Sequence, residues 1–345
     1  MLILGLETSC DETSAAVVSD GRTVLSNRVS SQIALHARTG GVVPEVASRL
    51  HIEQISWVIE DALREAGVSR TDIGAIAVSN RPGLLGALLV GVSAGKTLAY
   101  ALDIPLVAVH HIEAHIYANW LTGGDIAFPL VCLVVSGGHT EIFLMRGHGD
   151  YKVLGRTRDD AAGEAFDKSA RLLGFPYPGG ISIDRLAAEG GDPNAVALPR
   201  AWLGPDSLDF SFSGLKTAVK NAIDRAAFHP TDSSEPCALN PEPSQSDWAA
   251  SIQEAIVDVL VGKTLLAAKR HGVDLILLAG GVAANSRLQL RLREATAAAG
   301  MSLIVPPRAL CTDNAAMIAC AGHFHLIAGD IAGLDLDTIA SERLA

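Results

Sequence analysis

A pattern that occurs twice places the strongest restriction on the fold of this 345-residue chain. In residues 1–18 and again in residues 129–145, an apolar run leads into a short turn of small polar residues and then into a second apolar run. Each copy predicts two strands joined by a tight turn, and such a turn presents backbone N–H groups and hydroxyls to an anion. Either copy alone fits an ordinary hairpin. Together, near the starts of two comparable lengths of chain, they predict a duplicated domain.

Helical and strand patterns alternate after each copy. In the first half we expect a helix, a buried strand, a buried apolar helix and another strand, at residues 51–66, 73–79, 84–102 and 104–109. In the second half we expect a long helix, a strand and a further helix, at residues 247–270, 274–279 and 285–299. Residues 229–246, rich in Pro, Ser, Asp and Asn, predict a mobile surface loop. The alternation predicts an α/β protein whose sheets are covered by helices.

The composition argues against several classes of protein. A net charge of −11 argues against coating nucleic acid by bulk charge, although it leaves room for a local basic patch. Stretches without Asp, Glu, Lys or Arg, such as residues 126–140, are too short for a bilayer span of ~20 residues. The first residues do not form a signal peptide, and five cysteines without a CxxC pair argue against a disulfide scaffold or a zinc ribbon. We therefore expect a cytoplasmic protein that does not associate with membranes.

The sequence HHIEAH at residues 110–115 is the clearest sign of chemistry. His111 and His115 are four residues apart, so on a helix their imidazoles share one face and can bind one metal ion. A zinc protease of the HExxH type would carry glutamate directly after the first histidine. Here that residue is Ile112, and Glu113 points away from the histidine pair, which argues against peptide hydrolysis. The alternative is a pair of partly buried, hydrogen-bonded histidines.

A third metal ligand has to come from elsewhere in the chain. Asp313 stands at a predicted helix start after the break at Pro306 and Pro307. The simpler role for this aspartate is to cap the helix N-terminus. Two histidines and one carboxylate suit Fe(II) or Zn(II), and the residues alone do not separate these metals.

Further residues predict a site for a nucleotide or a sugar. Asp160, Glu164 and Asp167 are spaced to share one helical face, where they repel one another unless a cation or sugar hydroxyls engage them. A solvated helix start is the alternative. A turn at residues 177–180 lets backbone approach a ligand. The double glycine at residues 280–281, between a strand and a helix start, is typical of a phosphate-approach site.

Eight motifs, in this order along the chain, resemble the bacterial tRNA N6-adenosine threonylcarbamoyltransferase family, once labelled O-sialoglycoprotein endopeptidase. They are ETSCDET (7–13), GGVVPEVASRLH (40–51), HHIEAH (110–115), VSGGHTE (135–141), DDAAGEAFDK (159–168), DFSFSGLKT (209–217), AGGVAAN (279–285) and CTDNAAM (311–317). The resemblance implies the two-domain actin/Hsp70/sugar-kinase-like (ASKHA) fold, with duplicated RNase H-like domains. It implies an N-terminal domain at 1–128, with 320–345 packing back on it, and a C-terminal domain at 129–319.

The resemblance also implies an activity: transfer of a threonylcarbamoyl group from threonylcarbamoyl-AMP to N6 of the adenosine 3′-adjacent to the anticodon, in tRNAs reading codons that begin with A. A kinase-like ATPase and a non-catalytic scaffold subunit are the alternatives on the same fold. The implied partners, besides tRNA, are a shorter paralogue without the metal histidines, which forms a heterodimer with this chain, and a small P-loop ATPase.

Residue by residue, the resemblance assigns the metal ligands to His111, His115 and Asp313, with Fe(II) the usual metal and Zn(II) the alternative. Asp11 is our candidate for proton removal. The implied substrate-binding residues are Val134, Val135, Ser136, Gly137, Gly138, Asp167, Gly180, Asp184 and Asn285. One departure is Arg81, which stands where the family usually has glycine and leaves the conformation of that loop open.

An acidic chain that acts on RNA needs a basic surface somewhere. Residues 263–294 contain six Lys or Arg and two Asp or Glu, a local net charge of +4. This strip is either a phosphate-facing surface or the solvated side of two helices, and both interpretations fit the sequence.

Overall fold

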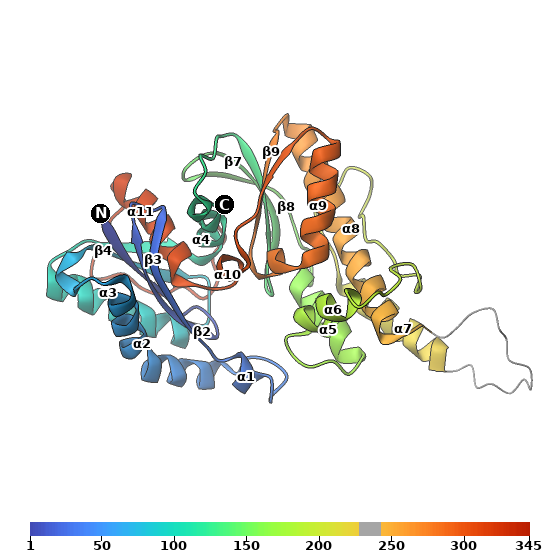
Figure 1. Cartoon of the computed structure of the whole chain (residues 1–345), viewed down its shortest axis with the longest axis horizontal. Helices are drawn as coiled ribbons and strands as arrows, with labels where there is room; N and C mark the ends of the chain where they lie inside the picture. Colours follow the sequence, from blue (N-terminus) through green and yellow to red (C-terminus); the bar gives the residue numbers. More distant parts are fainter. Residues whose placement is uncertain (228–242) are drawn as a thin grey trace, which may run out of the picture.

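The computed structural model describes residues 1–227 and 243–345, which form two five-stranded sheets (Figure 1). The first sheet has the order β3-β2-β1-β4-β5 and the second β10-β9-β6-β7-β8. The strands of the first are β1 (Leu2–Glu7), β2 (Glu12–Ser19), β3 (Thr23–Ser31), β4 (Ile73–Arg81) and β5 (Leu106–His110). Those of the second are β6 (Leu130–Val135), β7 (Thr140–Gly147), β8 (Asp150–Arg156), β9 (Leu275–Ala279) and β10 (Ser302–Ile304).

The two sheets have the same topology, which confirms the predicted duplication. In each, the first three strands pair antiparallel through short turns, as tight hairpins require. The fourth strand then pairs parallel with the first, and the fifth pairs parallel with the fourth. Parallel pairs need long crossovers, and helices occupy these connections. The two predicted hairpins are therefore the β1–β2 and β6–β7 pairs.

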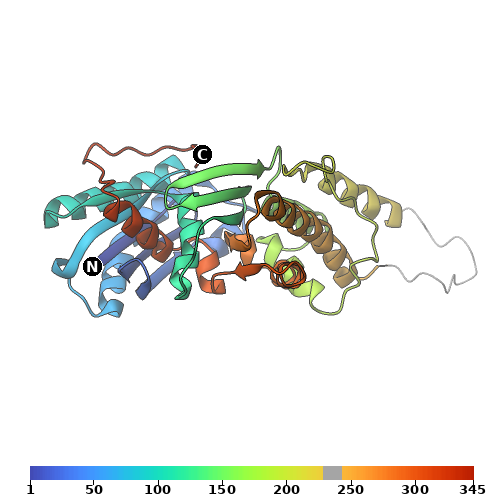
Figure 2. The same cartoon turned by 90° about the horizontal axis from the view of Figure 1, so that it is seen from above.

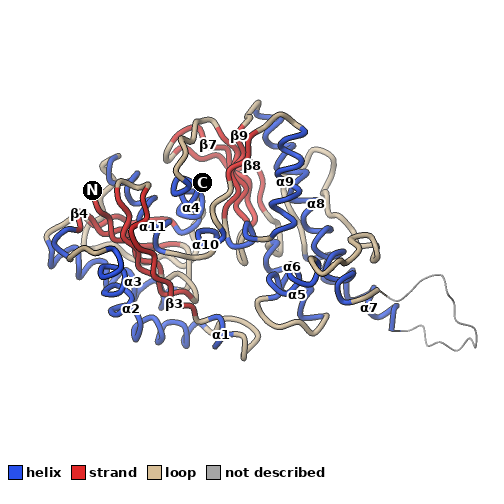
Figure 3. The backbone as a smooth tube through the Cα atoms, in the orientation of Figure 1, coloured by secondary structure: helices blue, strands red, loops and turns tan. Residues whose placement is uncertain are grey.

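Helices cover both faces of the first sheet (Figure 3). Helices α2 (Pro44–Ala66) and α3 (Leu85–Leu102) pack on one face, and α11 (Ala315–Ile327) packs on the other. Successive strand residues point to opposite faces, so Leu4 joins the core beneath α2 and α3, whereas Ile3 joins the core beneath α11. Helix α11 thus reaches the first sheet from the far end of the chain. The domain boundaries at 128 and 319 remain a prediction.

The second sheet separates two further layers. Val131 and Leu133 of β6 pack in a core with residues of α8 (Gln245–His271). Leu130 and Cys132 point the other way, into the core that contains α11 and the short helix α4. The remaining helices are α1 (Ile33–His36), α4 (His111–Tyr117), α5 (Ala162–Leu172), α6 (Gly179–Ala187), α7 (Ser213–Ala227), α9 (Ser286–Ala298), α10 (Arg308–Cys311) and the 3-10 turns η1 (Arg70–Asp72), η2 (Ala118–Thr122) and η3 (Gly281–Ala284). Helix α4 therefore lies between the two domains.

Some predicted bounds differ from those observed. Helix α2 begins at Pro44, not at residue 51, because proline suits the first helical turn. Most of the predicted loop at 229–246 lies outside the described residues, but Gln245 and Ser246 already belong to α8. The Ser244 side chain caps that helix by accepting from Asp247 N. Cys237 also lies outside the described residues, and the other four cysteines are free thiols.

Helix α3 is less buried than predicted. Leu85 and Leu89 are each 54% exposed, so one side of the helix faces outward. Ser93 and Thr97, both exposed, continue the line of Leu85 and Leu89 at intervals of four residues, so these two polar residues were the available signal for this side. In the part of the chain that the structure describes, α3 is also the one helix long and apolar enough to cross a membrane. It packs on β4 and α2 as a layer of the first domain.

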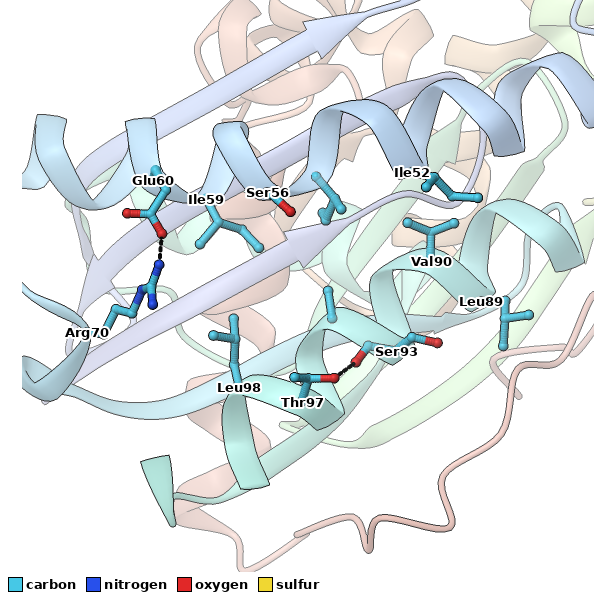
Figure 4. Close-up of a pocket in the computed structure, with 12 residues that line it drawn as sticks. Ile52, Ser56, Ile59, Glu60, Arg70, Leu89, Val90, Ser93, Thr97 and Leu98 are labelled. Carbon is cyan, nitrogen blue, oxygen red and sulfur yellow. Dashed lines mark hydrogen bonds and ion pairs between the residues drawn. The ribbon is translucent and has the colours of Figure 1, made fainter. Parts of the chain in front are cut away.

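A groove of 590 Å³ lies between α2 and α3 (Figure 4). Most of its lining is apolar, including Ile52, Ile59, Leu89 and Leu98. Its charged lining residues, Glu60 and Arg70, form an ion pair with each other. The groove therefore offers no free cation to a phosphate and no metal-ligand set.

The C-terminal segment, residues 328–345, runs back over the first domain. Its backbone pairs with the loop after β4: Ile339 N donates to Asn80 O at 2.9 Å, and Gly83 N donates to Ala340 O at 3.1 Å. Arg81 forms an ion pair with Glu342. The arginine that replaces the usual glycine thus fixes this loop against the C-terminal segment.

A buried network holds α4 in place. The Glu113 carboxylate accepts from Tyr151 Oη at 2.6 Å and bonds His325 Nε2 of α11 at 2.8 Å. His325 Nδ1 also bonds the Asp330 carboxylate at 2.8 Å. Glu113 is 3% exposed, so it needs these partners. The network joins α4 to both neighbouring layers and orients its other face.

This network predicts that stability depends on pH. The hydrogen bond from Glu113 raises the pKa of His325 above its ordinary 6.5. A raised folded pKa gives stability that is complete below the unfolded pKa and is lost as pH rises through the folded pKa. We expect the free energy of unfolding to lose this contribution as pH rises above 6.5. Urea unfolding between about pH 6 and pH 9 checks this, and His325→Gln should remove that part of the dependence. If the free energy of unfolding varied with pH in the same way for the wild type and His325→Gln, the prediction would be wrong.

Candidate metal and substrate site

The histidine pair lies at the start of helix α4, directly after β5 ends. His110 caps this helix through its ring nitrogen, which accepts from Ile112 N. The rings of His111 and His115 meet edge to face, with centroids 4.7 Å apart. Both side chains therefore project from one face of α4, as the spacing predicts. Glu113 points to the opposite network, also as predicted.

A carboxylate from the first hairpin orients His111. His111 Nδ1 bonds Glu7 Oε2 at 2.9 Å and Ser9 Oγ at 3.2 Å. Its Nε2 is then left to face Asp313. Carboxylates that bond the far nitrogen of a ligating histidine fix its ring and raise its basicity. Glu7 was not among the predicted residues; its place as the only charge in an apolar strand was the available signal.

Asp313 faces both histidines. The predicted capping role for Asp313 is wrong, because Asn314 caps α11 by accepting from Met317 N at 3.2 Å. Asp313 Oδ1 instead lies 3.2 Å from His115 Nε2 and 3.6 Å from His111 Nε2. Asn314 therefore leaves the neighbouring carboxylate free for the cluster.

The cluster fits a metal ion by its unsatisfied groups. His115 is fully buried, yet neither ring nitrogen has a hydrogen-bond partner among the described residues. Such groups are costly unless something engages them. Single ligand atoms of His111, His115 and Asp313 all lie within 4.8 Å of one another. Two imidazoles and a carboxylate suit a divalent transition metal.

The electrostatics of the cluster also favour a cation. Burial lowers the pKa of His111, but the Glu7 and Asp313 carboxylates outweigh it and raise that pKa to about 9. Burial raises the pKa of Asp313, but His111 and His115 hold it well below its usual range. The site therefore stabilises positive charge strongly.

A cavity of 520 Å³, the Asp11 cavity, opens beside His111 and Asp313. The turns of both predicted hairpins line it, including Asp11 and the predicted Ser136, Gly137 and Gly138. No Lys or Arg belongs to its lining. Apart from its histidines, the ionisable side chains with a carboxylate or amine are all carboxylates. A metal bound by the cluster would therefore supply positive charge for an anionic ligand.

A second cavity of 270 Å³, the Asp167 cavity, adjoins the first. Its lining contains five of the predicted substrate-binding residues: Gly137, Asp167, Gly180, Asp184 and Asn285. The two cavities share Gly137, Tyr177, Gly281 and Thr312. A ligand can therefore extend from one into the other.

Both aspartates of this cavity hold backbone in place. Asp167 Oδ1 accepts from Gly179 N at 2.7 Å and Gly180 N at 3.3 Å. Asp184 Oδ1 accepts from Ser286 N at 3.1 Å and from Ser286 Oγ at 2.7 Å. Burial raises the pKa of Asp167, and the two glycine N–H groups oppose that shift. Each carboxylate thus shapes the cavity wall as well as facing it.

Asp160, Glu164 and Asp167, which were predicted to share one helical face, do not all face a ligand site. Helix α5 begins at Ala162, so Asp160 lies outside it. Lys168 Nζ lies 2.7 Å from Asp160 and 3.0 Å from Glu164. A lysine of the same segment therefore neutralises two of the three carboxylates, and only Asp167 lines the cavity.

Two predicted residues lie beneath the site and line neither cavity. Val134 and Val135 are fully buried in β6. The carbonyl of Val135 packs against Gly280, whose φ of 91° and lack of a side chain permit this approach. Tyr177 and Glu12 are among the lining residues that were not predicted to bind. Burial, Asp313 and Asp11 raise the pKa of Glu12 to about 10.

The basic strip at 263–294 is mostly neutralised within the protein. Buried Lys263 donates to the carbonyl oxygens of Trp202 at 2.7 Å and Ser207 at 2.9 Å. Arg270 pairs with Asp206, and both Arg287 and Arg291 pair with buried Glu254. Of the six cations, Lys263, Lys269 and Arg293 have no ion-pair partner within the described ranges, and only Lys269 and Arg293 of these are exposed. The strip is therefore not the free phosphate-facing surface weighed above.

Solved structures of low sequence identity share this fold. HypF in its phosphate- and nucleotide-bound form aligns with a TM-score of 0.60 and 15% identity, covering 94% of this chain and 55% of HypF. Component A of (R)-2-hydroxyglutaryl-CoA dehydratase from Acidaminococcus fermentans aligns with a TM-score of 0.53 and 12% identity, covering 95% of this chain and 99% of that one. The predicted two-domain ASKHA fold is confirmed.

Sequence relatives cover nearly the whole chain. A protein named tRNA N6-adenosine threonylcarbamoyltransferase from Dehalococcoides mccartyi (strain CBDB1) is 55% identical over 339 residues, which is 98% of each chain. A protein of the same name from Bacillus subtilis (strain 168) is 56% identical over 323 residues, 93% of this chain and 90% of the relative. The sequence profile of the same family matches residues 23–320. The chain therefore belongs to the tRNA N6-adenosine threonylcarbamoyltransferase family.

Proposed function

We propose that this chain transfers a threonylcarbamoyl group from threonylcarbamoyl-AMP to N6 of the adenosine 3′-adjacent to the anticodon, in tRNAs reading codons that begin with A. The adenosine amine attacks the carbamoyl carbon, the bond from that carbon to the phosphate oxygen breaks, and AMP and a proton leave. The observation that carries this proposal is the junction of two cavities, one beside the His111/His115/Asp313 cluster and one walled by Asp167 and Asp184.

The AMP part of the donor occupies the Asp167 cavity in this proposal. Asp167 and Asp184 present carboxylates that accept hydrogen bonds from ribose hydroxyls, while Asn285 borders the same space. Gly137 lies where the two cavities meet, which puts the reactive anhydride next to the Asp11 cavity. Positioning matters because the adenine amine is a weak nucleophile.

The residues of the cluster would hold one divalent metal through His111, His115 and Asp313, and we propose Fe(II) ahead of Zn(II). When bound, such a metal supplies Lewis-acid stabilisation of an anionic oxygen, worth several kcal/mol. Glu7 keeps His111 in the tautomer that leaves Nε2 free. The N–H groups of Gly137 and Gly138 offer further stabilisation of developing oxyanion charge.

Asp11 is proposed to accept the proton released from the amine. It lines the cavity beside His111 and is 7% exposed, so it can reach a ligand there. Burial and the neighbouring carboxylates of Asp313 and Asp11 raise the pKa of Glu12 to about 10, so the proposed role falls to Asp11 and not to the protonated Glu12. The support for this role is that Asp11 lines the same cavity as His111 and Asp313.

The two rival functions fit the site less well. A sugar- or acid-kinase-like ATPase has no need of the buried His/His/Asp set. A scaffold subunit would not need two adjoining cavities, one beside the Asp313 carboxylate and the other lined by the carboxylates of Asp167 and Asp184. We also propose a cytoplasmic location and two protein partners, a shorter paralogue and a small P-loop ATPase.

The proposal is tested by incubating the purified chain, with those partners, with threonine, bicarbonate, ATP and unmodified tRNA. Nucleoside mass analysis should then find threonylcarbamoyladenosine. Product at equal yield without this chain, or none with all components and intact metal, would remove the proposed activity.

Replacing Asp167 by alanine should weaken adenylate binding. The substitution leaves the N–H groups of Gly179 and Gly180 without their acceptor and opens the cavity wall. We expect a loss of about 1–3 kcal/mol in the affinity for AMP or a stable adenylate analogue, measured by calorimetry. Asp274→Ala, which removes an exposed carboxylate of the same domain, is the matched control. Equal affinities for all three proteins would remove Asp167 from the site.

A further inference from the structure

The Asp11 cavity cannot itself bind an RNA backbone. Its lining has no Lys or Arg, and it carries Asp11, Glu12, Asp313 and Glu342. RNA phosphates must therefore be bound outside the cavity, by cations that are not engaged in ion pairs. The strip at 263–294 supplies few of them, because three of its six cations are in ion pairs and buried Lys263 is held by carbonyl oxygens.

One end of such a surface lies at the C-terminal segment. Glu342 lines the Asp11 cavity, so the next residue, Arg343, stands at its rim. Arg156 is the register partner of Glu141 across β7 and β8. Burial raises the pKa of Glu141, and the guanidinium groups of Arg156 and Arg343 oppose this shift, so both arginines lie near that carboxylate. Neither arginine forms an ion pair with any of the described residues.

Helix α7 continues the same surface. It begins beside the end of β8, because Asp159 accepts from Phe212 N at 2.8 Å and Ser213 N at 3.1 Å. Lys216 and Lys220 are exposed and one turn apart on this helix. Neither has an ion-pair partner in the residues described. Their ammonium groups are therefore available to an anion.

The arrangement in space puts these cations on one side of the molecule. Figure 2 shows the C-terminal segment and the yellow helix α7 along the same long edge. The yellow-green helices α5 and α6, which wall the Asp167 cavity, lie toward the opposite edge. A donor and an RNA acceptor could thus enter from different sides and meet where the cavities join.

We propose that Arg156, Lys216, Lys220 and Arg343, together the rim surface, bind the phosphate backbone of the tRNA anticodon stem-loop. The inference rests on the proposed function and names the surface that its RNA substrate uses. Phosphate contacts of this kind position a nucleic acid without reading its sequence. The rim surface thereby holds the loop so that its target base reaches into the Asp11 cavity.

The test measures binding of an anticodon stem-loop RNA to the full chain by fluorescence anisotropy across a salt series. Lys216→Glu/Lys220→Glu should weaken binding at least about tenfold and reduce the slope of log K against log salt by about 2. Lys216→Gln/Lys220→Gln should do the same more weakly. Lys269→Glu/Arg293→Glu, which changes two unpaired cations of the strip by the same charge, is the matched control and should bind like the wild type.

The outcomes separate this inference from the function itself. Rim variants that bind RNA like the wild type, or a control that loses as much, overturn the inference. Rim variants that keep RNA binding but no longer bind the small ATPase would assign the surface to a protein and also overturn it. A wild-type protein that binds the RNA through the rim yet yields no threonylcarbamoyladenosine with its partners would instead refute the proposed function.

Discussion

Replacing His111 and His115 together by alanine should abolish metal binding and lower the rate of threonylcarbamoyl transfer at least about a thousandfold. The loss follows from removing Lewis-acid stabilisation of several kcal/mol, since each 1.36 kcal/mol corresponds to a tenfold change in rate. Among the described residues His115 has Asp313 as its one ion-pair partner, at 3.2 Å, and neither ring nitrogen makes a hydrogen bond, so little native hydrogen bonding is lost with it. Metal analysis of the purified protein and initial rates of tRNA modification measure the two effects.

The exposed His271 at the end of α8 provides the control. His271→Ala should keep one metal per chain and the wild-type rate. Circular dichroism should show that the double variant remains folded. One equivalent of metal in the folded double variant would refute the assignment of the ligands.

Glu113→Ala should cause the largest loss of stability, about 3–5 kcal/mol in the free energy of unfolding. The substitution leaves His325 charged and partly buried without its main partner, and breaking a buried ion pair on one side carries this cost. It also removes the acceptor of the Tyr151 hydroxyl. Urea unfolding at a pH near 6, where His325 is charged, measures the change.

Glu113→Gln keeps an oxygen acceptor for Tyr151 and should cost less than the alanine variant. Glu294→Ala, on the exposed side of α9, should change stability by less than about 0.5 kcal/mol. A Glu113→Ala protein as stable as the wild type would show that the network does not hold α4.

The sequence predicted those features that depend on residues close together in the chain. The two hairpins and the histidine pair depend on residues within a few positions of one another, and the structure has all three. Asp313 could be placed near a helix start but not oriented, because its freedom depends on the neighbouring Asn314 taking the cap. The residues offered Asp313 as a third ligand, and the resemblance to a family assigned it to the histidines.

Contacts between distant segments account for what the sequence did not predict. Glu7 meets His111 across 104 positions, and no spacing rule links them. Arg287 and Arg291 pair with Glu254 of the preceding helix and Arg270 pairs with Asp206, so counting charges within the strip at 263–294 overestimated its free positive charge. Helix α3 was expected to be buried because apolar residues dominate it, although the exposed Ser93 and Thr97 marked its outer side.

The position of the C-terminal segment has a consequence for synthesis of the protein. Every strand of both sheets ends by Ile304, whereas Asp313 and the cavity-lining residues 340–342 follow. A ribosome therefore makes both sheets before it makes Asp313, and it makes residues 340–342, which complete the lining of the Asp11 cavity, later still. A chain cut off between Ile304 and Ala340 would keep every strand of both sheets but lack part of this lining.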